Sequence, residues 1–319
     1  MSGVDAMARR PFQQLPFQSI PAGPRKPHSF FEIKSHEVTT KSPKLGELRV
    51  HYREFGEGPP LLLVHGLMTT SYSYRYVLDG LGARFRLIIP DLPGCGKTQA
   101  PPNGAFGPAD LAMWIGDFQK ATGIEGSAAI GNSMGGYLCM RHALESPGAF
   151  SRLVNIHSPA VPDLKLDALA AAIRLPGARR LAAALPKLVG TSRWVHKNVH
   201  YHDETLKSLE EAREYGDPLA TPEGARAFAG YLSETMAASG LRAFLRDLEA
   251  RKEAGRRFPC PLLLVYARQD PLVSPSNGEA LHKLVPASEL VWLDQTSHFA
   301  HVDSPERVVE VVLPFLTAS

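Results

Sequence analysis

The sequence predicts an α/β protein in which a mostly parallel sheet is covered by helices and a helical cap is inserted into the core. Short apolar runs bounded by turn residues alternate with stretches of helical periodicity, which is the pattern of a parallel sheet. This alternation stops from about Pro159 to Phe258, where helical stretches rich in Ala, Leu and Arg follow one another without a strand-like run. A length of 319 residues suits one α/β core that carries such an insertion.

The individual elements are predicted from the period of their apolar residues. An antiparallel first strand is expected at Leu48–Phe55, where polar and apolar residues alternate. The continuous apolar runs that predict buried strands are Leu61–Val64, Leu87–Pro90, Ala128–Ile130, Leu262–Val265 and Leu290–Leu293. The segments with helical spacing are Ala109–Ala121, Met134–Leu144 and Pro305–Leu316 in the core, and Asp203–Tyr215 and Gly224–Ala238 in the insertion.

These patterns divide the chain into four parts. Residues 1–28 are expected to form a flexible extension, because they contain five prolines and no apolar stretch long enough for a signal peptide. Residues 29–158 and 258–319 are the two parts of the α/β core, and residues 159–257 are the helical cap.

Composition and charge exclude several functional classes. With 35 basic and 32 acidic residues the formal net charge is +3, and the basic residues are spread along the chain, so nucleic acid is not expected as a partner. A membrane span is not expected either, because crossing a bilayer takes about 20 apolar residues. The most apolar cap stretch, Leu166–Val189, is interrupted by Arg174, Pro176, Arg179, Arg180 and Pro186. The oligomeric state is left open.

The three cysteines indicate a reducing compartment. Cys95, Cys139 and Cys260 are odd in number and lie in core-like segments, which favours free thiols over a disulfide framework. We therefore expect a cytoplasmic location.

The segment Gly131-Asn132-Ser133-Met134-Gly135-Gly136 matches the G-x-S-x-G pattern between an apolar run and a helical segment. A nucleophile on so sharp a turn is strained, and the flanking glycines let the strand and the helix approach. The turn would lift the Ser133 hydroxyl out of the sheet and aim the N–H of Met134 at a developing oxyanion. The alternative is a glycine-rich turn with a bystander serine.

A nucleophilic serine needs a base and a carboxylate, in the chain order acid and then histidine. Asp270 lies just beyond the strand predicted at Leu262–Val265, at the carboxyl edge of the sheet. His298 follows the last predicted strand. We predict that Asp270 orients His298 as the general base, the alternatives being a turn-capping aspartate and a surface-loop histidine.

Two other patterns do not support a cofactor or a metal. Gly96-Lys97-Thr98 copies the end of a phosphate-binding loop, but position 91 is aspartate where the first glycine would stand. His196, His200 and His202 have the spacing of metal ligands on a helix, yet position 197 is lysine rather than the glutamate of a zinc hydrolase. We expect no metal and no cofactor.

From Phe30 to its C-terminus the chain resembles the α/β-hydrolase superfamily. Leu62-Leu63-Val64-His65-Gly66-Leu67 is similar to the family's strand followed by His-Gly, which implies that the N–H of Leu67 is the second oxyanion donor. Asp91–Thr98 is similar to the family's loop after the next strand, which implies a turn beside the pocket.

Two branches of this superfamily share motifs with the chain. The Gly131–Gly136 hexapeptide resembles that of C–C bond hydrolases acting on aromatic ring-cleavage products. The stretch His65–Arg75 resembles haloalkane dehalogenases and epoxide hydrolases, whose nucleophile is an aspartate where this chain has Ser133. A serine with an oxyanion hole and an apolar cap favours hydrolysis of a carboxylic ester of a small hydrophobic molecule through an acyl-enzyme. The C–C hydrolase and a non-catalytic small-ligand binding protein on the same fold remain as alternatives.

Overall fold

The computed structural model describes residues 10–175 and 177–318. Within these residues eight strands form one sheet in the order β1-β2-β4-β3-β5-β6-β7-β8. The strands are β1 (Lys34–Ser42), β2 (Gly46–Phe55), β3 (Pro60–Val64), β4 (Arg86–Pro90), β5 (Ala128–Asn132), β6 (Leu153–Ile156), β7 (Leu262–Ala267) and β8 (Glu289–Leu293). β2 is antiparallel to both β1 and β4, and the remaining pairs are parallel. This sheet confirms the predicted fold class.

The sequence did not predict two of these strands. β1 is an edge strand with mostly exposed or half-buried polar residues, so it lacks the apolar run that indicates a buried strand. β6 is only four residues long, and Asn155 interrupts its apolar character. The Asn155 side chain is nevertheless buried, because its Oδ1 accepts a hydrogen bond from the backbone N–H of Ser158 at 3.1 Å.

The core helices cover both faces of the sheet. They are α1 (Leu78–Gly82), α2 (Pro108–Thr122), α3 (Met134–Glu145), α10 (Ser276–Leu284), α11 (Ala300–Asp303) and α12 (Pro305–Thr317), with the short turns η1 (Phe17–Ser19) and η2 (Ser71–Tyr74). Alternate strand residues face opposite sides. Leu62 and Val64 therefore pack in the core with α2, α3 and α10, whereas Leu61 and Leu63 pack in the core with α1, α11 and α12.

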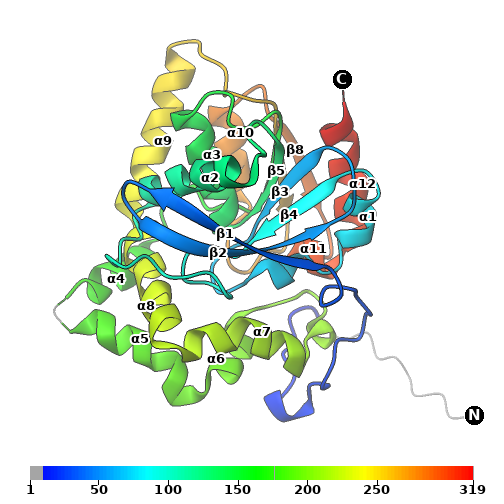
Figure 1. Cartoon of the computed structure of the whole chain (residues 1–319), viewed down its shortest axis with the longest axis vertical. Coiled ribbons are helices and arrows are strands. Elements are labelled where there is room, and N and C mark those ends of the chain that lie inside the picture. The colour runs from blue at the N-terminus through cyan, green and yellow to red at the C-terminus, as the bar shows by residue number, and fades with distance from the viewer. Residues whose placement is uncertain (1–9, 176, 319) are drawn as a thin grey trace, which may run out of the picture.

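A block of helices is inserted between β6 and β7. Its members are α4 (Leu164–Ile173), α5 (Ala178–Val189), α6 (Thr191–Asn198), η3 (Glu204–Leu206), α7 (Leu209–Ala220), α8 (Pro222–Gly230), η4 (Tyr231–Thr235) and α9 (Ala238–Glu253). In Figure 1 the helices α4 to α8 lie below the sheet, and α9 returns along its side to the core. No helix among the described residues has the length and apolar character that crossing a membrane requires.

Both helices predicted in the insertion are wrong in their boundaries. Asp203–Tyr215 is interrupted, because Ser208 accepts a hydrogen bond from the N–H of Glu211 and so begins α7 with a cap. Gly224–Ala238 contains the end of α8 and the π-helical turn η4, and Ala238 already belongs to α9.

The N-terminal segment contacts the inserted helices. Of the predicted flexible extension, residues 1–9 lie outside the described residues. The N–H of Phe12 donates to the carbonyl of His202 at 3.1 Å, and the N–H of Leu209 donates to the carbonyl of Pro21 at 2.8 Å. His28 Nε2 lies 2.9 Å from the Glu210 carboxylate. Residues 10–28 thus run along α6 and α7, and the division into four parts stays a prediction.

A buried ion pair joins the inserted helices to the core. Arg75, just after η2, pairs with Glu211 of α7, and the side chains are 0% and 3% exposed. The Tyr201 hydroxyl donates to the Glu211 carboxylate at 2.6 Å. The Arg75 guanidinium also lies 4.4 Å from the ring centres of Tyr72 and Tyr76. Each charge is therefore compensated where water does not reach it.

Removing one partner of this pair should destabilise the fold. Glu211→Gln keeps the shape but leaves the Arg75 charge buried and uncompensated, so we expect a loss of about 3–5 kcal/mol in the free energy of unfolding. Urea denaturation followed by circular dichroism measures the loss. Glu47→Gln is the matched control, because its partner Lys41 is 3.9 Å away and both side chains are mostly exposed. Equal stability of the two variants would contradict the prediction.

Candidate active site

Ser133 occupies the sharp turn between β5 and α3. Its backbone has φ 54° and ψ −124°, a conformation that a non-glycine residue rarely adopts. The N–H of Ser133 donates to the carbonyl of Ile156 at 2.8 Å, and the carbonyl of Ser133 accepts from the N–H of Tyr137 at 3.1 Å. These bonds fix the turn between β6 and the first turn of α3. The strain predicted at this position is therefore present.

The glycines around Ser133 are required by close backbone contacts. A Cβ on Gly131 would lie 2.6 Å from the Cα of Gly136, and a Cβ on Gly135 would collide with the carbonyl oxygens that end β3. Gly66 faces the serine from the loop after β3, since a Cβ there would lie 2.9 Å from the Ser133 Cβ. Strand, helix and loop meet at the serine because none of these positions carries a side chain.

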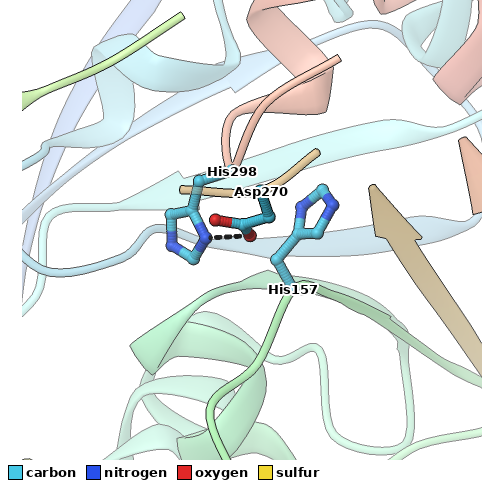
Figure 2. A group of neighbouring side chains, drawn as sticks. All are labelled: His157, Asp270 and His298. Carbon is cyan, nitrogen blue, oxygen red and sulfur yellow. Dashed lines mark hydrogen bonds and ion pairs between the residues drawn. The ribbon is translucent and has the colours of Figure 1, made fainter. Parts of the chain in front are cut away.

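The structure brings Asp270 and His298 together. Asp270 follows β7 and His298 lies between β8 and α11, and His298 Nδ1 is 2.7 Å from Asp270 Oδ2 (Figure 2). The other oxygen, Oδ1, accepts from the N–H groups of Leu272 and Val273 at 2.7 and 2.9 Å. Asp270 therefore caps its own turn and also binds the histidine.

The Asp270 carboxyl is held in its charged form. Burial alone would raise the pKa of Asp270, but the charge and hydrogen bond of His298 and the backbone N–H of Val273 outweigh burial and lower that pKa below its ordinary value. The Asp270 side chain is 0% exposed and the His298 side chain 4% exposed. The pair is thus protected from solvent on most sides.

Asn132 connects the serine turn to the His298 loop. Its side-chain Nδ2 donates to the carbonyl of His298 at 3.1 Å and to that of Ile156 at 3.3 Å. The residue before the serine therefore holds the backbone of the histidine. Ser133, Asp270 and His298 follow β5, β7 and β8, which are parallel, so all three lie at the same edge of the sheet.

His157 is a residue of this site that the sequence analysis did not find. It follows β6 with φ 54°, is 0% exposed, and its Nε2 accepts the backbone N–H of Ala267. Its ring centre lies 5.6 Å from that of His298, and Figure 2 shows it beside the Asp270 carboxylate. Burial lowers the pKa of His157 to about 4, against the opposing charge of Asp270. His157 is therefore neutral at neutral pH.

His157, Asp270 and His298 each offer a ligand atom, and these atoms lie within 4.8 Å of one another; among the described residues this is the one such group of three. One nitrogen of each histidine already has a partner, and the buried Nδ1 of His157 has none among the described residues. His157 Nε2 faces the N–H of Ala267, and His298 Nδ1 faces Asp270. Hydrogen bonds thus hold the Asp270 carboxylate and one nitrogen of each histidine in place.

The three histidines that have metal-ligand spacing in the sequence have separate partners. His196 Nε2 bonds the carbonyl of Leu15 at 2.8 Å, and His200 Nδ1 lies 3.1 Å from the Glu204 carboxylate. The ring of His202 packs edge-on against Phe12. His196 and His202 thus contact the N-terminal segment, whereas the partner of His200 lies within the inserted block.

The peptide between Gly66 and Leu67 has a fixed orientation. The Gly66 carbonyl accepts from Thr69 Oγ1 at 3.0 Å and from His65 Nδ1 at 2.8 Å, while His65 Nε2 accepts the N–H of Leu92 at 2.9 Å. Because the peptide is planar and trans, holding this carbonyl points the N–H of Leu67 the opposite way. The N–H groups of Leu67 and Met134 have no acceptor within residues 10–175 and 177–318.

The loop after β4 is shaped by Asp91. Its carboxylate is 2.8 Å from His51 Nδ1 and accepts the N–H groups of Ser71 and Lys97 at 2.9 and 3.1 Å. Gly96, with φ 51°, has no room for a side chain because Asp91 occupies it. This is the turn that the family resemblance implied, and the Lys97 N–H binds a carboxylate rather than a phosphate.

An apolar cavity lies between the His-Gly loop and the inserted helices. The side chains that line it include Leu67, Met68, Cys95, Leu219, Phe228 and Tyr231. Its volume of about 20 Å³ has room for little more than one water.

The buried His157 should make stability depend on pH. The unfolded chain binds a proton near pH 6.5, whereas the folded His157 binds one only near pH 4, so unfolding becomes easier as the pH falls through this window. Between neutral pH and pH 4 the wild type should lose roughly 3 kcal/mol of its free energy of unfolding because of His157, and His157→Gln should not show this part of the loss. Urea denaturation at several pH values measures it. His142→Gln is a positive control, because burial also lowers the pKa of His142 to about 4. A wild-type slope in the His157 variant would refute the assignment.

Comparisons with known proteins show similarity over most of the chain. Haloalkane dehalogenase 2 of Mycobacterium tuberculosis is 26% identical over 269 residues, which cover 83% of this chain and 90% of that protein. A thermophilic esterase from Thermogutta terrifontis has a TM-score of 0.63 at 22% identity, covering 89% of this chain and 98% of its own. A meta-cleavage product hydrolase from Pseudomonas fluorescens IP01 has a TM-score of 0.65 at 21% identity, with the same coverage. These two solved structures show likeness of fold alone.

The family model described as the alpha/beta hydrolase fold matches residues 59–305, which is more than half of the sequence. The match begins just before β3 and ends at the start of α12, so it includes Ser133, Asp270 and His298. The chain belongs to the α/β hydrolase fold family.

Proposed function

We propose that the protein is a serine hydrolase that cleaves a carboxylic ester of a small hydrophobic molecule through an acyl-enzyme. Ser133 is the nucleophile, His298 the general base and Asp270 the residue that orients His298. The observation that carries the proposal is the 2.7 Å contact between His298 Nδ1 and Asp270 at the sheet edge where Ser133 sits on a strained turn.

The Asp270 contact determines which nitrogen of His298 is basic. A charged carboxylate accepts the proton on Nδ1, which leaves the lone pair of Nε2 free to take the Ser133 proton. As the hydroxyl oxygen attacks the ester carbonyl, His298 becomes charged beside Asp270. It then gives the proton to the leaving alcohol. A water activated by the same histidine releases the acid and restores Ser133.

Two backbone N–H groups are proposed to stabilise the oxyanion. Met134 begins α3, so its N–H is unpaired by the helix and lies at the positive end of the helix dipole. Leu67 belongs to the peptide whose carbonyl is held by His65 and Thr69, beside the serine. Donors fixed before the reaction need no rearrangement when charge develops on the substrate oxygen.

The side chain at position 133 separates this proposal from the dehalogenase and epoxide hydrolase chemistry of similar proteins. Alkyl-enzyme chemistry uses an aspartate nucleophile, and a serine alkoxide instead suits attack on a carbonyl carbon. The apolar side chains of the cavity beside Leu67 favour a hydrophobic acyl or alcohol group. A carboxylic ester meets both conditions.

A C–C bond hydrolase is the second candidate, because the Gly131–Gly136 hexapeptide resembles that of enzymes acting on aromatic ring-cleavage products. A panel of p-nitrophenyl esters and a coloured dienol ring-cleavage product distinguish the two activities. Ester turnover with no bleaching of the dienol supports the proposal. Bleaching without ester turnover replaces it with the C–C reaction, and ligand binding without turnover of either substrate replaces it with a binding protein.

Loss of the serine hydroxyl should abolish catalysis. We expect Ser133→Ala to show no ester turnover above background and no labelling by a fluorophosphonate, since no other group supplies the nucleophile. Ser146→Ala, at the exposed C-terminus of α3, is the matched control and should keep both. Normal labelling of the Ser133 variant would rule out Ser133 as nucleophile.

Neutralising the orienting carboxylate should reduce kcat much more than KM. In Asp270→Asn the amide can donate to Nδ1 and so favours the wrong tautomer of His298, and we expect kcat to fall on the order of ten thousandfold. Steady-state kinetics with the best ester of the panel measures this. Asp294→Asn removes an exposed carboxylate of the neighbouring loop and should leave kcat unchanged. A loss below tenfold in Asp270→Asn would contradict the role of Asp270.

A further inference from the structure

The outer helices of the inserted block expose an unusual amount of apolar surface. Among the described residues, eight of the eleven exposed large hydrophobic side chains lie between residues 161 and 189. They are Val161, Leu164, Leu169, Leu175, Leu181, Leu185, Leu188 and Val189. Figure 1 places α4 and α5 at the outer corner of the block, away from the sheet. Single exposed apolar side chains are common on protein surfaces, whereas a group gathered in this way indicates an interaction surface.

The leucines of α5 form one stripe. Leu181, Leu185 and Leu188 are spaced four and three residues apart, which places them on one face of the helix, and they are 62%, 43% and 76% exposed. Pro186, on another face, is buried. The helix therefore packs on the block with its small residues and turns its large apolar residues to solvent.

The part of this surface around α5 is basic and carries no acid. The acids of the surface are Asp163 and Asp167, by the start of α4, and Asp167 pairs with Arg242 at 3.7 Å. Residues 174–193 contain Arg174, Arg179, Arg180, Lys187 and Arg193, and no Asp or Glu. Arg179 is used inside the protein, where it pairs with Glu234 at 2.8 Å. Arg180 and Lys187 are exposed and seven residues apart, so they lie together along one flank of the leucine stripe.

We propose that α4 and α5 dock this surface on an anionic lipid membrane, with the α5 leucines inserted among the acyl chains and Arg180 and Lys187 at the lipid headgroups. An amphipathic helix with leucines on one face and basic residues beside them lies in the plane of a membrane interface. α5 has 12 residues, so it extends along the surface rather than through it.

Charge argues against a second copy of this chain as the occupant. A two-fold symmetric dimer through α5 would bring the same surface of both subunits together. Arg180 and Lys187 would then face cations of the partner, with no acid between residues 174 and 193 to compensate them. Glu223 on the neighbouring α8 already pairs with Arg226 at 3.0 Å. An anionic lipid surface offers acyl chains to the exposed leucines and negative charge to Arg180 and Lys187.

Vesicle cosedimentation tests the proposal on the full chain. The protein should bind vesicles of phosphatidylcholine mixed with phosphatidylglycerol, bind phosphatidylcholine alone much more weakly, and lose binding at high salt. Equal binding to both vesicles, or binding to neither, would overturn the proposal.

Two variants locate the surface. Arg180→Gln with Lys187→Gln should weaken binding to the anionic vesicles roughly thirtyfold. Leu181→Gln, Leu185→Gln and Leu188→Gln together should weaken it at least about a hundredfold, because three apolar side chains no longer enter the lipid. Glutamine keeps the helix propensity of these positions. Unchanged thermal unfolding of each variant, followed by circular dichroism, excludes misfolding as the reason for the loss.

Matched controls use apolar and basic residues elsewhere on the surface. Met113→Gln removes an exposed side chain of α2, and Arg256→Gln with Arg257→Gln removes two exposed cations after α9. Both controls should bind anionic vesicles like the wild type. Loss of binding in a control but not in the α5 variants would overturn the assignment to α5. A dimer in sedimentation velocity that the leucine variant abolishes would also overturn it, because the stripe would then be a self-association surface.

Discussion

The positive φ of Ser133 brings β5 and α3 so close together that the neighbouring positions have no room for a side chain. Gly131, Gly135 and Gly66 each lie where a Cβ would strike backbone or the serine itself. Such a turn persists only when the surrounding structure holds it, and here β6 does so through the carbonyl of Ile156. Among the described non-glycine residues five have positive φ, and four of them, Met68, Ser133, His157 and Gln295, lie in the loops after β3, β5, β6 and β8. Backbone strain is thus concentrated at the edge of the sheet that carries the proposed catalytic residues.

Buried neutral histidines tie these strained loops to one another. His65 follows β3 and accepts the N–H of Leu92, which follows β4. His157 follows β6 and accepts the N–H of Ala267, the last residue of β7. In both residues burial lowers the pKa, which keeps one nitrogen available as an acceptor. The strands that end at this edge are therefore held together by side chains as well as by the hydrogen bonds of the sheet. These contacts support the loops that carry the proposed base, His298, and the proposed oxyanion donor, Leu67.

The sequence predicted those parts of the fold that have a local signal. Buried parallel strands are continuous apolar runs, so β3, β4, β5, β7 and β8 were found within a few residues of their ends. The polar edge strand β1 and the short β6 have no such run, and His157 was missed because the strand before it was missed. Asp270 and His298 were predicted from chain order after the serine. The hydrogen bond between them joins residues 28 positions apart, which no local pattern describes.

The inserted helices meet two opposite requirements on their two sides. Toward the core, α7 buries the Glu211 carboxylate against Arg75 of the loop after η2, so charge is placed where a sequence pattern expects apolar residues. Toward solvent, α5 exposes Leu181 and Leu188, so apolar residues are placed where a pattern expects charge. The buried ion pair costs desolvation but is directional, and it ties α7 to the segment that follows η2. Under the proposed docking, acyl chains rather than water cover the exposed leucines. A block fixed to the core on one side and free to meet a lipid surface on the other satisfies both requirements.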